Sequence, residues 1–262
     1  MTRSSEAPAS AAARRGRVPD FFIVGHPKSG TTALYEMLRS HPQIHMPVKE
    51  PWFFTRELIS GAVPRSPERP QTLEAYLALF EAAGSEQLIG EATPSYLRSH
   101  LAATSIAELC PDARIVAILR EPAEFLRSFH LQSVQSGIEN ERDLRTALDL
   151  EPARREGREL PPGSARPEAL QYSSHVRYVE QLRRYHEAFG AERVLVMIYE
   201  DFRAENVASV RRVLRFLGVD DEQELAPSEA NPSVRVRNAR LERLLRSLSL
   251  GAGPGARALR AT

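Results

Sequence analysis

The chain has almost no cysteine and almost no net charge, and both shortages narrow what it can be. Cys110 is the only cysteine among 262 residues, so neither an internal disulfide nor a cysteine-rich metal site can form. The 35 Lys and Arg residues are balanced by 34 Asp and Glu residues. This balance argues against a general polyanion binder, although it leaves room for a local anion site. We therefore expect a cytoplasmic protein without a nucleic-acid partner.

Long apolar runs are also missing. No run reaches the roughly 18 residues of a membrane span, and the first 17 residues lack the apolar core of a secretory signal. We expect no membrane span and predict a disordered N-terminal arm over residues 1–18. The length favours one domain, predicted over residues 19–240, followed by a C-terminal helix or tail over 241–262.

Apolar segments that are present predict the fold. Four short runs predict buried strands, and the last two are continuously apolar, which is typical of a sheet covered by helices on both faces. Between these runs, apolar residues recur at helical spacing and predict helices. The alternation predicts an α/β fold, a P-loop-like three-layer sandwich with a central, mainly parallel sheet flanked by helices. The predicted strands are Phe21–Val24, Leu88–Gly90, Ile115–Leu119 and Val194–Ile198.

Two proline-rich stretches interrupt this pattern. Residues 60–71 contain three prolines and are predicted to be a surface loop. Residues 151–167 are charged and contain Pro152, Pro161, Pro162 and Pro167. We predict that this second stretch is a mobile insert.

A glycine-containing turn joins the first predicted strand to a helix. It reads Gly25-His26-Pro27-Lys28-Ser29-Gly30-Thr31-Thr32. Such a turn points free backbone N–H groups at one spot, and the helix dipole adds partial positive charge there. Lys28 adds a full charge, and the hydroxyls add donors. The segment predicts a phosphate cradle, and its candidate ligands are Lys28, Ser29, Gly30, Thr31 and Thr32.

The cradle differs from the usual nucleotide-triphosphatase loop. That loop places its lysine directly after the second glycine, whereas Lys28 precedes Gly30 here. A P-loop kinase or NTPase that transfers phosphate from ATP stays an alternative. Its best support is the predicted strand at 194–198, which runs into Glu200 and Asp201 and could imitate a Mg²⁺-binding strand. A binding module without enzymatic activity is a second alternative.

The motif Pro27–Thr32 after an apolar strand resembles the 5′-phosphosulfate loop of sulfotransferases that use 3′-phosphoadenosine-5′-phosphosulfate (PAPS). A second segment, Arg114–Gly137, resembles the family's 3′-phosphate segment. Arg120 ends a predicted strand, at the edge where open α/β sheets bind ligands, and Ser128 follows two helical turns later. The resemblance implies PAPS as cofactor, with Arg120 and Ser128 as 3′-phosphate ligands and Arg235 as a further cofactor ligand.

Two more segments resemble the carbohydrate, Golgi-type branch of this family. They are Lys49–Phe54, with Glu50 before the aromatic residues Trp52, Phe53 and Phe54, and Gly90–Tyr96. The chain departs from that branch at Ala92, where some of its members have lysine, and in Asn231–Arg235, where a Lys- and Gly-rich segment is frequent.

The resemblance implies transfer of a sulfuryl group to a hydroxyl or amine of a saccharide, glycoconjugate or small-molecule natural product. Lys28 would stabilise charge on the departing phosphate. Glu50 is the implied base, with water excluded by the neighbouring aromatic rings, and Glu91 is the second candidate. We expect no metal, because Pro42 interrupts any helix that would align His41 with His45. Composition leads us to expect a soluble bacterial enzyme of secondary metabolism.

Overall fold

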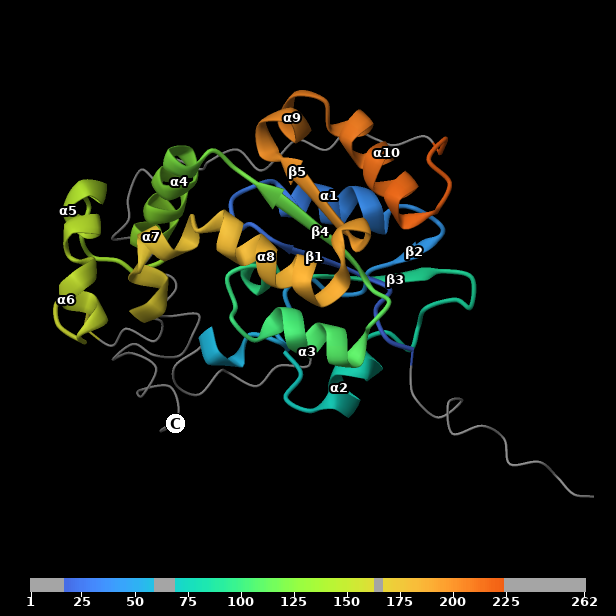
Figure 1. Ribbon diagram of the computed structural model, residues 1–262, viewed down its shortest axis with the longest axis horizontal. Coiled ribbons are helices and arrows are strands. Elements are labelled where there is room, and N and C mark those ends of the chain that lie inside the picture. Colours follow the sequence, from blue (N-terminus) through green and yellow to red (C-terminus); the bar gives the residue numbers. More distant parts are fainter. Residues whose placement is uncertain (1–16, 59–68, 163–166, 224–262) are drawn as a thin grey trace, which may run out of the picture. The chain divides into compact units, whose positions relative to one another are not determined.

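The computed structural model describes residues 17–58, 69–162 and 167–223. These residues form two compact units (Figure 1). The first contains residues 17–57, 69–120 and 178–223, and the second contains residues 121–162 and 167–177 together with residue 58. The predicted single domain spans both units. Arg235, the predicted C-terminal helix and nearly all of the predicted N-terminal arm lie outside the described residues.

The first unit is built on a five-stranded sheet with the order β2-β3-β1-β4-β5, in which every pair of neighbours is parallel. The four strands predicted from apolar runs are confirmed. The fifth, β2, pairs with the start of β3 and is too short to leave a periodic signal. The strands are β1 Phe21–Gly25, β2 Ile44–His45, β3 Leu88–Ala92, β4 Arg114–Leu119 and β5 Val194–Ile198.

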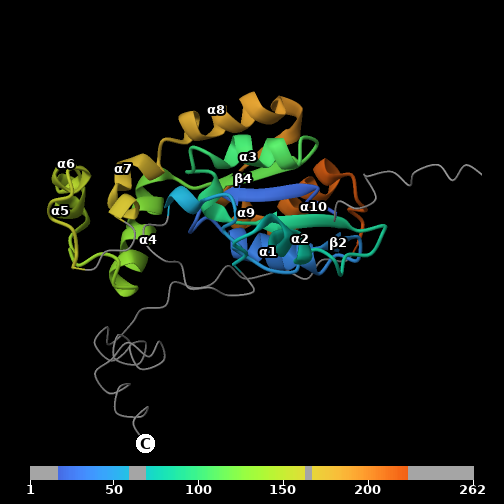
Figure 2. The same ribbon diagram turned by 90° about the horizontal axis from the view of Figure 1, so that it is seen from below.

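Helices cover both faces of this sheet. Figure 1 shows α2 and α3 below the strands and α9 and α10 above them, and Figure 2 shows α3 and α8 on the opposite side of the sheet from α1. The predicted three-layer α/β fold is therefore confirmed. The helices on one face are α1 Thr31–Arg39, α9 Tyr199–Ala204 and α10 Asn206–Leu217; those on the other are α2 Leu73–Ala78, α3 Ala102–Leu109 and α8 Tyr178–Phe189.

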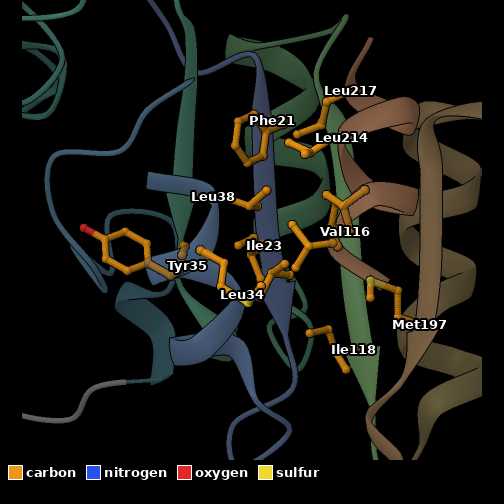
Figure 3. Close-up of a cluster of buried hydrophobic side chains, with 14 of the residues drawn as sticks. Phe21, Ile23, Leu34, Tyr35, Leu38, Val116, Ile118, Met197, Leu214 and Leu217 are labelled. Carbon is orange, nitrogen blue, oxygen red and sulfur yellow. The ribbon is translucent and has the colours of Figure 1, made fainter. Parts of the chain in front are cut away.

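Strand β1 explains the continuous apolar runs. Phe21 and Ile23 face the core beneath α1 and α10, whereas Phe22 and Val24 face the core beneath α3 and α8. All four side chains are 0% exposed, because successive strand residues point to opposite faces and both faces are covered. Figure 3 shows the first of these cores, in which Leu34 and Leu38 of α1 lie beside Ile23.

Three short 3-10 helices complete the first unit or adjoin it. They are η2 Arg56–Leu58, η3 Pro94–Tyr96 and η5 Ala191–Arg193. In the part of the chain that the structure describes, no helix combines the length and apolar character that a bilayer span requires.

The second unit is helical. Its elements are α4 Pro122–Gln135, α5 Leu144–Asp149, α6 Glu151–Arg155, η4 Pro167–Leu170 and α7 Tyr172–His175.

Residues 151–155, the start of the predicted mobile insert, thus form helix α6. Arg154 pairs with Glu139 at 2.7 Å, and both side chains are 0% exposed. The Tyr172 hydroxyl also donates to Glu139. Pro152 lies in the first turn of α6, where proline is tolerated, and Arg154 has its partner within the same unit.

The connections of the sheet point to one edge as a ligand site. The chain leaves the carboxyl end of the central strand β1 for α1 on one face, whereas β3 leads to α3 on the other face. Open α/β sheets bind ligands where neighbouring strands diverge in this way. The loop after β1 and the residues after β3 and β4 all stand at this edge.

Candidate functional site

Two glycines shape the loop between β1 and α1. A Cβ atom on Gly25 would lie 2.5 Å from the Cβ of Leu97. Gly30 has φ +79°, and a Cβ there would lie 3.0 Å from the ring of Phe202. Both positions therefore require glycine, one for lack of space and the other for a left-handed backbone as well.

Helix α1 begins immediately after this loop with its first-turn N–H groups available. Gly30 is the N-cap residue and makes no side-chain cap hydrogen bond, and the first turn contains no acidic residue. The first N–H groups of a helix have no partner within the helix, and the helix dipole adds partial positive charge to them. This end of α1 is therefore suited to bind an anion.

Lys28 and Arg120 bring two full positive charges to the same place. A guanidinium nitrogen of Arg120, Nη1, donates to the backbone carbonyl of Lys28 at 3.1 Å. Burial lowers the pKa of the Lys28 ammonium group, and the positive charge of Arg120 lowers it further. Two cations held this close repel one another, and an anion bound beside both would offset that repulsion.

Aromatic residues orient Arg120. Its guanidinium lies 4.9 Å from the centroid of the Tyr199 ring, a cation–π arrangement, and its carbonyl accepts a hydrogen bond from the Tyr178 hydroxyl at 3.0 Å. The Tyr178 ring in turn contacts His26 of the loop edge to face. The end of β4 is thus tied to α9, to α8 and to the loop, and the charge of Arg120 is held in one direction.

The other predicted cofactor ligands differ in their surroundings. Ser29 is buried and donates to the carbonyl of Pro27 within its own loop, at 3.4 Å. Thr31 is buried at the start of α1, whereas Thr32 is exposed. Ser128 is half-buried on α4, in the second unit.

Glu50 lies in a segment that is anchored on the end of β3. Its backbone N–H donates to the carbonyl of Ala92 at 2.8 Å. Its carboxylate accepts from Lys49 Nζ at 2.5 Å and from Trp52 Nε1 at 3.2 Å, and the side chain is 38% exposed. The carboxylate is therefore oriented by two donors while it keeps access to solvent.

The aromatic residues after Glu50 divide into two groups. The Trp52 indole hydrogen-bonds with Glu50, and the Arg69 guanidinium lies 4.5 Å from the centroid of the indole ring. The rings of Phe53 and Phe54 instead pack against Tyr76, with centroid distances of 4.3 and 5.3 Å. We expected all three rings to exclude water from Glu50. In the structure, Phe53 and Phe54 pack into the core, whereas Trp52 contacts Glu50 and Arg69.

Glu91 is enclosed in a cluster of hydroxyl groups. Its side chain is 0% exposed and accepts hydrogen bonds from Tyr76 and Tyr96 on one oxygen, at 2.8 and 2.9 Å, and from Thr93 on the other, at 2.7 Å. Burial raises the pKa of the Glu91 carboxyl to about 7, although the three hydrogen bonds act in the opposite direction. Sequence reasoning missed Tyr76, which comes from α2 and leaves no local signal beside Glu91.

The best sequence support for a kinase was an acidic pair at the end of the last predicted strand, and the structure places this pair outside the strand. Strand β5 ends at Ile198, and Glu200 and Asp201 lie in the first turn of α9 with side chains that are not buried. They therefore do not extend the strand as a buried Mg²⁺-binding acid would.

Comparisons with known proteins agree on one family. A sequence model described as "Sulfotransferase family" matches residues 19–223. A sulfotransferase from Alicyclobacillus acidocaldarius has a similar structure, with a TM-score of 0.70 and 28% identity over 93% of this chain and 96% of that one. The sulfotransferase domain of the Synechococcus PCC 7002 olefin synthase has the same fold, with a TM-score of 0.51 and 19% identity over 91% of this chain and 96% of the other.

Curated relatives match over part of their length. Mouse heparan sulfate glucosamine 3-O-sulfotransferase 6 is 27% identical over 83% of this chain and 57% of its own length. The membrane-associated sulfotransferase kil1 of Dictyostelium discoideum is 34% identical over 45% of this chain and 24% of its own length. The chain thus spans between about a quarter and somewhat more than half of these two relatives.

Proposed function

Because the chain belongs to the sulfotransferase family, we propose that it transfers a sulfuryl group from PAPS to an acceptor hydroxyl or amine. The observation that carries the choice of donor is the convergence of Lys28, Arg120 and the N-terminus of α1 at one edge of the sheet. PAPS bears phosphate groups at two positions. Two cations and a helix N-terminus suit such a ligand.

The residues at this edge offer the cofactor positive charge and hydrogen-bond donors. The helix start requires glycine at position 30, because any side chain there would strain the backbone and meet Phe202. When bound, PAPS supplies the activated sulfuryl group. Lys28 and the first N–H groups of α1 would bind the 5′ side and stabilise negative charge there. Arg120 would bind the 3′-phosphate, and Ser128 and Arg235 stay predicted ligands on the family resemblance.

We assign the base to Glu50 in preference to Glu91. The Glu50 carboxylate has solvent access and is oriented by Lys49 and Trp52, so it can accept a proton from an acceptor hydroxyl or amine. The oxygens of Glu91 are occupied by three hydroxyl donors inside the core. An acceptor would have to displace this packing to reach Glu91.

The acceptor proposed is a saccharide or glycoconjugate. The names of two relatives support this class: heparan sulfate glucosamine 3-O-sulfotransferase 6 and carbohydrate sulfotransferase 15, both of mouse. A small-molecule natural product is the second candidate. Cytoplasmic location and a role in secondary metabolism stay predictions from composition.

Binding of 3′,5′-adenosine bisphosphate, measured by calorimetry, tests the cofactor site. We expect Lys28→Ala to weaken binding by about 10- to 100-fold, because a charge-assisted contact is lost. Arg39→Ala is the matched control, since it removes one positive charge from the far end of α1, where Arg39 pairs with Glu36. Equal binding by Lys28→Ala and the native protein would overturn the assignment.

A screen of saccharide and small-molecule acceptors with isotope-labelled PAPS, read by mass spectrometry, tests the reaction. Glu50→Gln is expected to lose at least about 100-fold in kcat while binding 3′,5′-adenosine bisphosphate normally. A binding module would show no transfer in either protein. A kinase would instead transfer phosphate from ATP with Mg²⁺.

A further inference from the structure

The hydroxyl cluster around Glu91 is connected to the segment that bears Glu50. Tyr96 donates its hydroxyl hydrogen to Glu91, which leaves the Tyr96 oxygen free to act as an acceptor. The backbone N–H of Phe54 donates to that oxygen at 3.4 Å. Glu91 is thus linked through one side chain to the main chain of the segment 49–54.

Ring packing makes a second connection. Glu91 also holds the Tyr76 hydroxyl, and the Tyr76 ring stacks on Phe53 with an interplanar angle of 9°. Phe54 packs edge to face on both tyrosines, with centroid distances of 5.3 Å to Tyr76 and 5.6 Å to Tyr96. The two tyrosines that Glu91 orients therefore form the surface on which the segment rests.

The segment needs this support, because its backbone is unusual. Glu50 has φ +62° and Trp52 has φ +58°, a region that residues other than glycine seldom occupy. Such conformations persist where the surroundings determine them. A further restraint, the hydrogen bond from Glu50 N–H to the carbonyl of Ala92, also lies beside Glu91 in the chain.

We propose that Glu91 is a positioning residue that, through Tyr76 and Tyr96, fixes the segment 49–54 and so sets where the Glu50 carboxylate stands. This inference rests on the proposed role of Glu50 as the base. It assigns Glu91 no contact with acceptor or cofactor. Its three hydroxyl partners are the means by which it acts, and the effect is transmitted by hydrogen bonds and ring packing.

Trp52 provides a readout that does not depend on activity, because it is the only tryptophan of the chain and lies within the segment. We expect Glu91→Gln and Tyr96→Phe each to raise acrylamide quenching of Trp52 fluorescence by at least about twofold, since the segment loses a restraint. Tyr35→Phe is the matched control: it removes a buried tyrosine hydroxyl that bonds to the carbonyl of Met46 on the other face of the sheet. Native quenching in both variants would overturn the proposal.

A double-mutant cycle separates positioning from direct chemistry. If Glu91 acts through Glu50, Glu91→Gln should lower kcat by about 10-fold or more in the native protein but by less than about twofold in Glu50→Gln. KM for PAPS should stay within about twofold in each variant. Equal losses in both backgrounds would mean that Glu91 acts independently, and the positioning role would be wrong.

The two proposals fail in different ways. A native rate for Glu50→Gln would refute the assignment of the base, whereas the fluorescence comparison would still decide whether Glu91 holds the segment. Should Glu91→Gln fail to fold, Tyr96→Phe removes the same link to Phe54 while it retains the ring, and it enters the same cycle. Additivity between Tyr96→Phe and Glu50→Gln would then reject the inference.

Discussion

The guanidinium of Arg120 donates to the backbone carbonyl of Lys28 over 3.1 Å, so the end of β4 and the loop after β1 are joined at the main chain. The lysine side chain takes no part in this bond. Arg120 can therefore hold the loop through its main chain, and the Lys28 ammonium group is not used for this contact. The spacing of the two cations is set by the sheet, since β1 and β4 are neighbours.

Gly30→Ala should damage both stability and cofactor binding. The left-handed backbone and the approach to Phe202 predict a loss of about 1–3 kcal/mol in the free energy of unfolding and at least about 10-fold weaker binding of 3′,5′-adenosine bisphosphate. Gly157→Ala is the control, because Gly157 has φ +80° with nothing within 4 Å of a new Cβ. Chemical denaturation and calorimetry should show a stability loss in both variants and a binding loss only in Gly30→Ala.

The ring of Tyr199 should matter for Arg120 more than its hydroxyl does. Tyr199→Leu removes the π-face beneath the guanidinium and is expected to weaken binding of 3′,5′-adenosine bisphosphate by about 3- to 10-fold. Tyr199→Phe keeps the face and should bind within about twofold of the native protein. Equal binding constants for the leucine and phenylalanine variants would contradict this role.

Glu91 should make stability depend on pH in the direction opposite to a salt-bridged acid. Burial raises its folded pKa from 4.5 to about 7, so its favourable contribution is complete below the unfolded pKa and is lost as pH rises through about 7. Between pH 4.5 and about 7, the free energy of unfolding of the native protein should fall relative to that of Glu91→Gln by about 1.4 kcal/mol for each pH unit.

Urea denaturation at several pH values, followed by circular dichroism, measures this slope. The groups that interact electrostatically with Glu91 are Tyr76, Tyr96, Tyr185 and Cys110, and burial raises the pKa of each of them. Because these pKa values are raised above the ordinary values of tyrosine and cysteine, the four groups stay protonated between pH 4.5 and 7. Parallel curves for the native protein and Glu91→Gln would rule out the expected titration.

Removal of only one member of the buried ion pair in the second unit should strongly lower the free energy of unfolding. Arg154→Met leaves the buried Glu139 without its cationic partner, and we expect a loss of about 3–5 kcal/mol in the free energy of unfolding. Adding Glu139→Gln should recover much of this loss, because the unpaired charge disappears while Tyr172 can still donate. Chemical denaturation of the single and double variants checks both values, and a double variant less stable than Arg154→Met would contradict the explanation.

The sequence predicted those elements of the fold that leave a pattern in consecutive residues. The strands at Ile115–Leu119 and Val194–Ile198 were predictable because covering both sheet faces makes every residue apolar. The two-residue strand β2 was not, since it exists only through its pairing with β3. Helix α6 leaves little local signal, since Arg154 pairs with Glu139, 15 residues away in the chain.

The residues of the candidate site also divide into those that the sequence predicted and those that only the structure revealed. Lys28 and Arg120 could be placed at one edge, because both follow strands that a parallel sheet aligns. The cluster around Glu91 could not be predicted, since Tyr76 precedes it by 15 residues and reaches it only when α2 packs on the sheet. Sequence patterns thus identified groups at strand ends, whereas partners that depend on packing required the structure.

Lys28 and Lys49 are the only two lysines of the chain, and arginine supplies the other fixed positive side chains. Lys28 lies in the loop after β1 and Lys49 lies beside Glu50, so each marks one part of the proposed site. Reductive methylation with ¹³C-formaldehyde would therefore place just two side-chain labels in the protein, both at the place of interest. Because burial and Arg120 lower the pKa of Lys28, its dimethylamine resonance should shift at a lower pH than that of an ordinary lysine, and a bound phosphate should reverse the change.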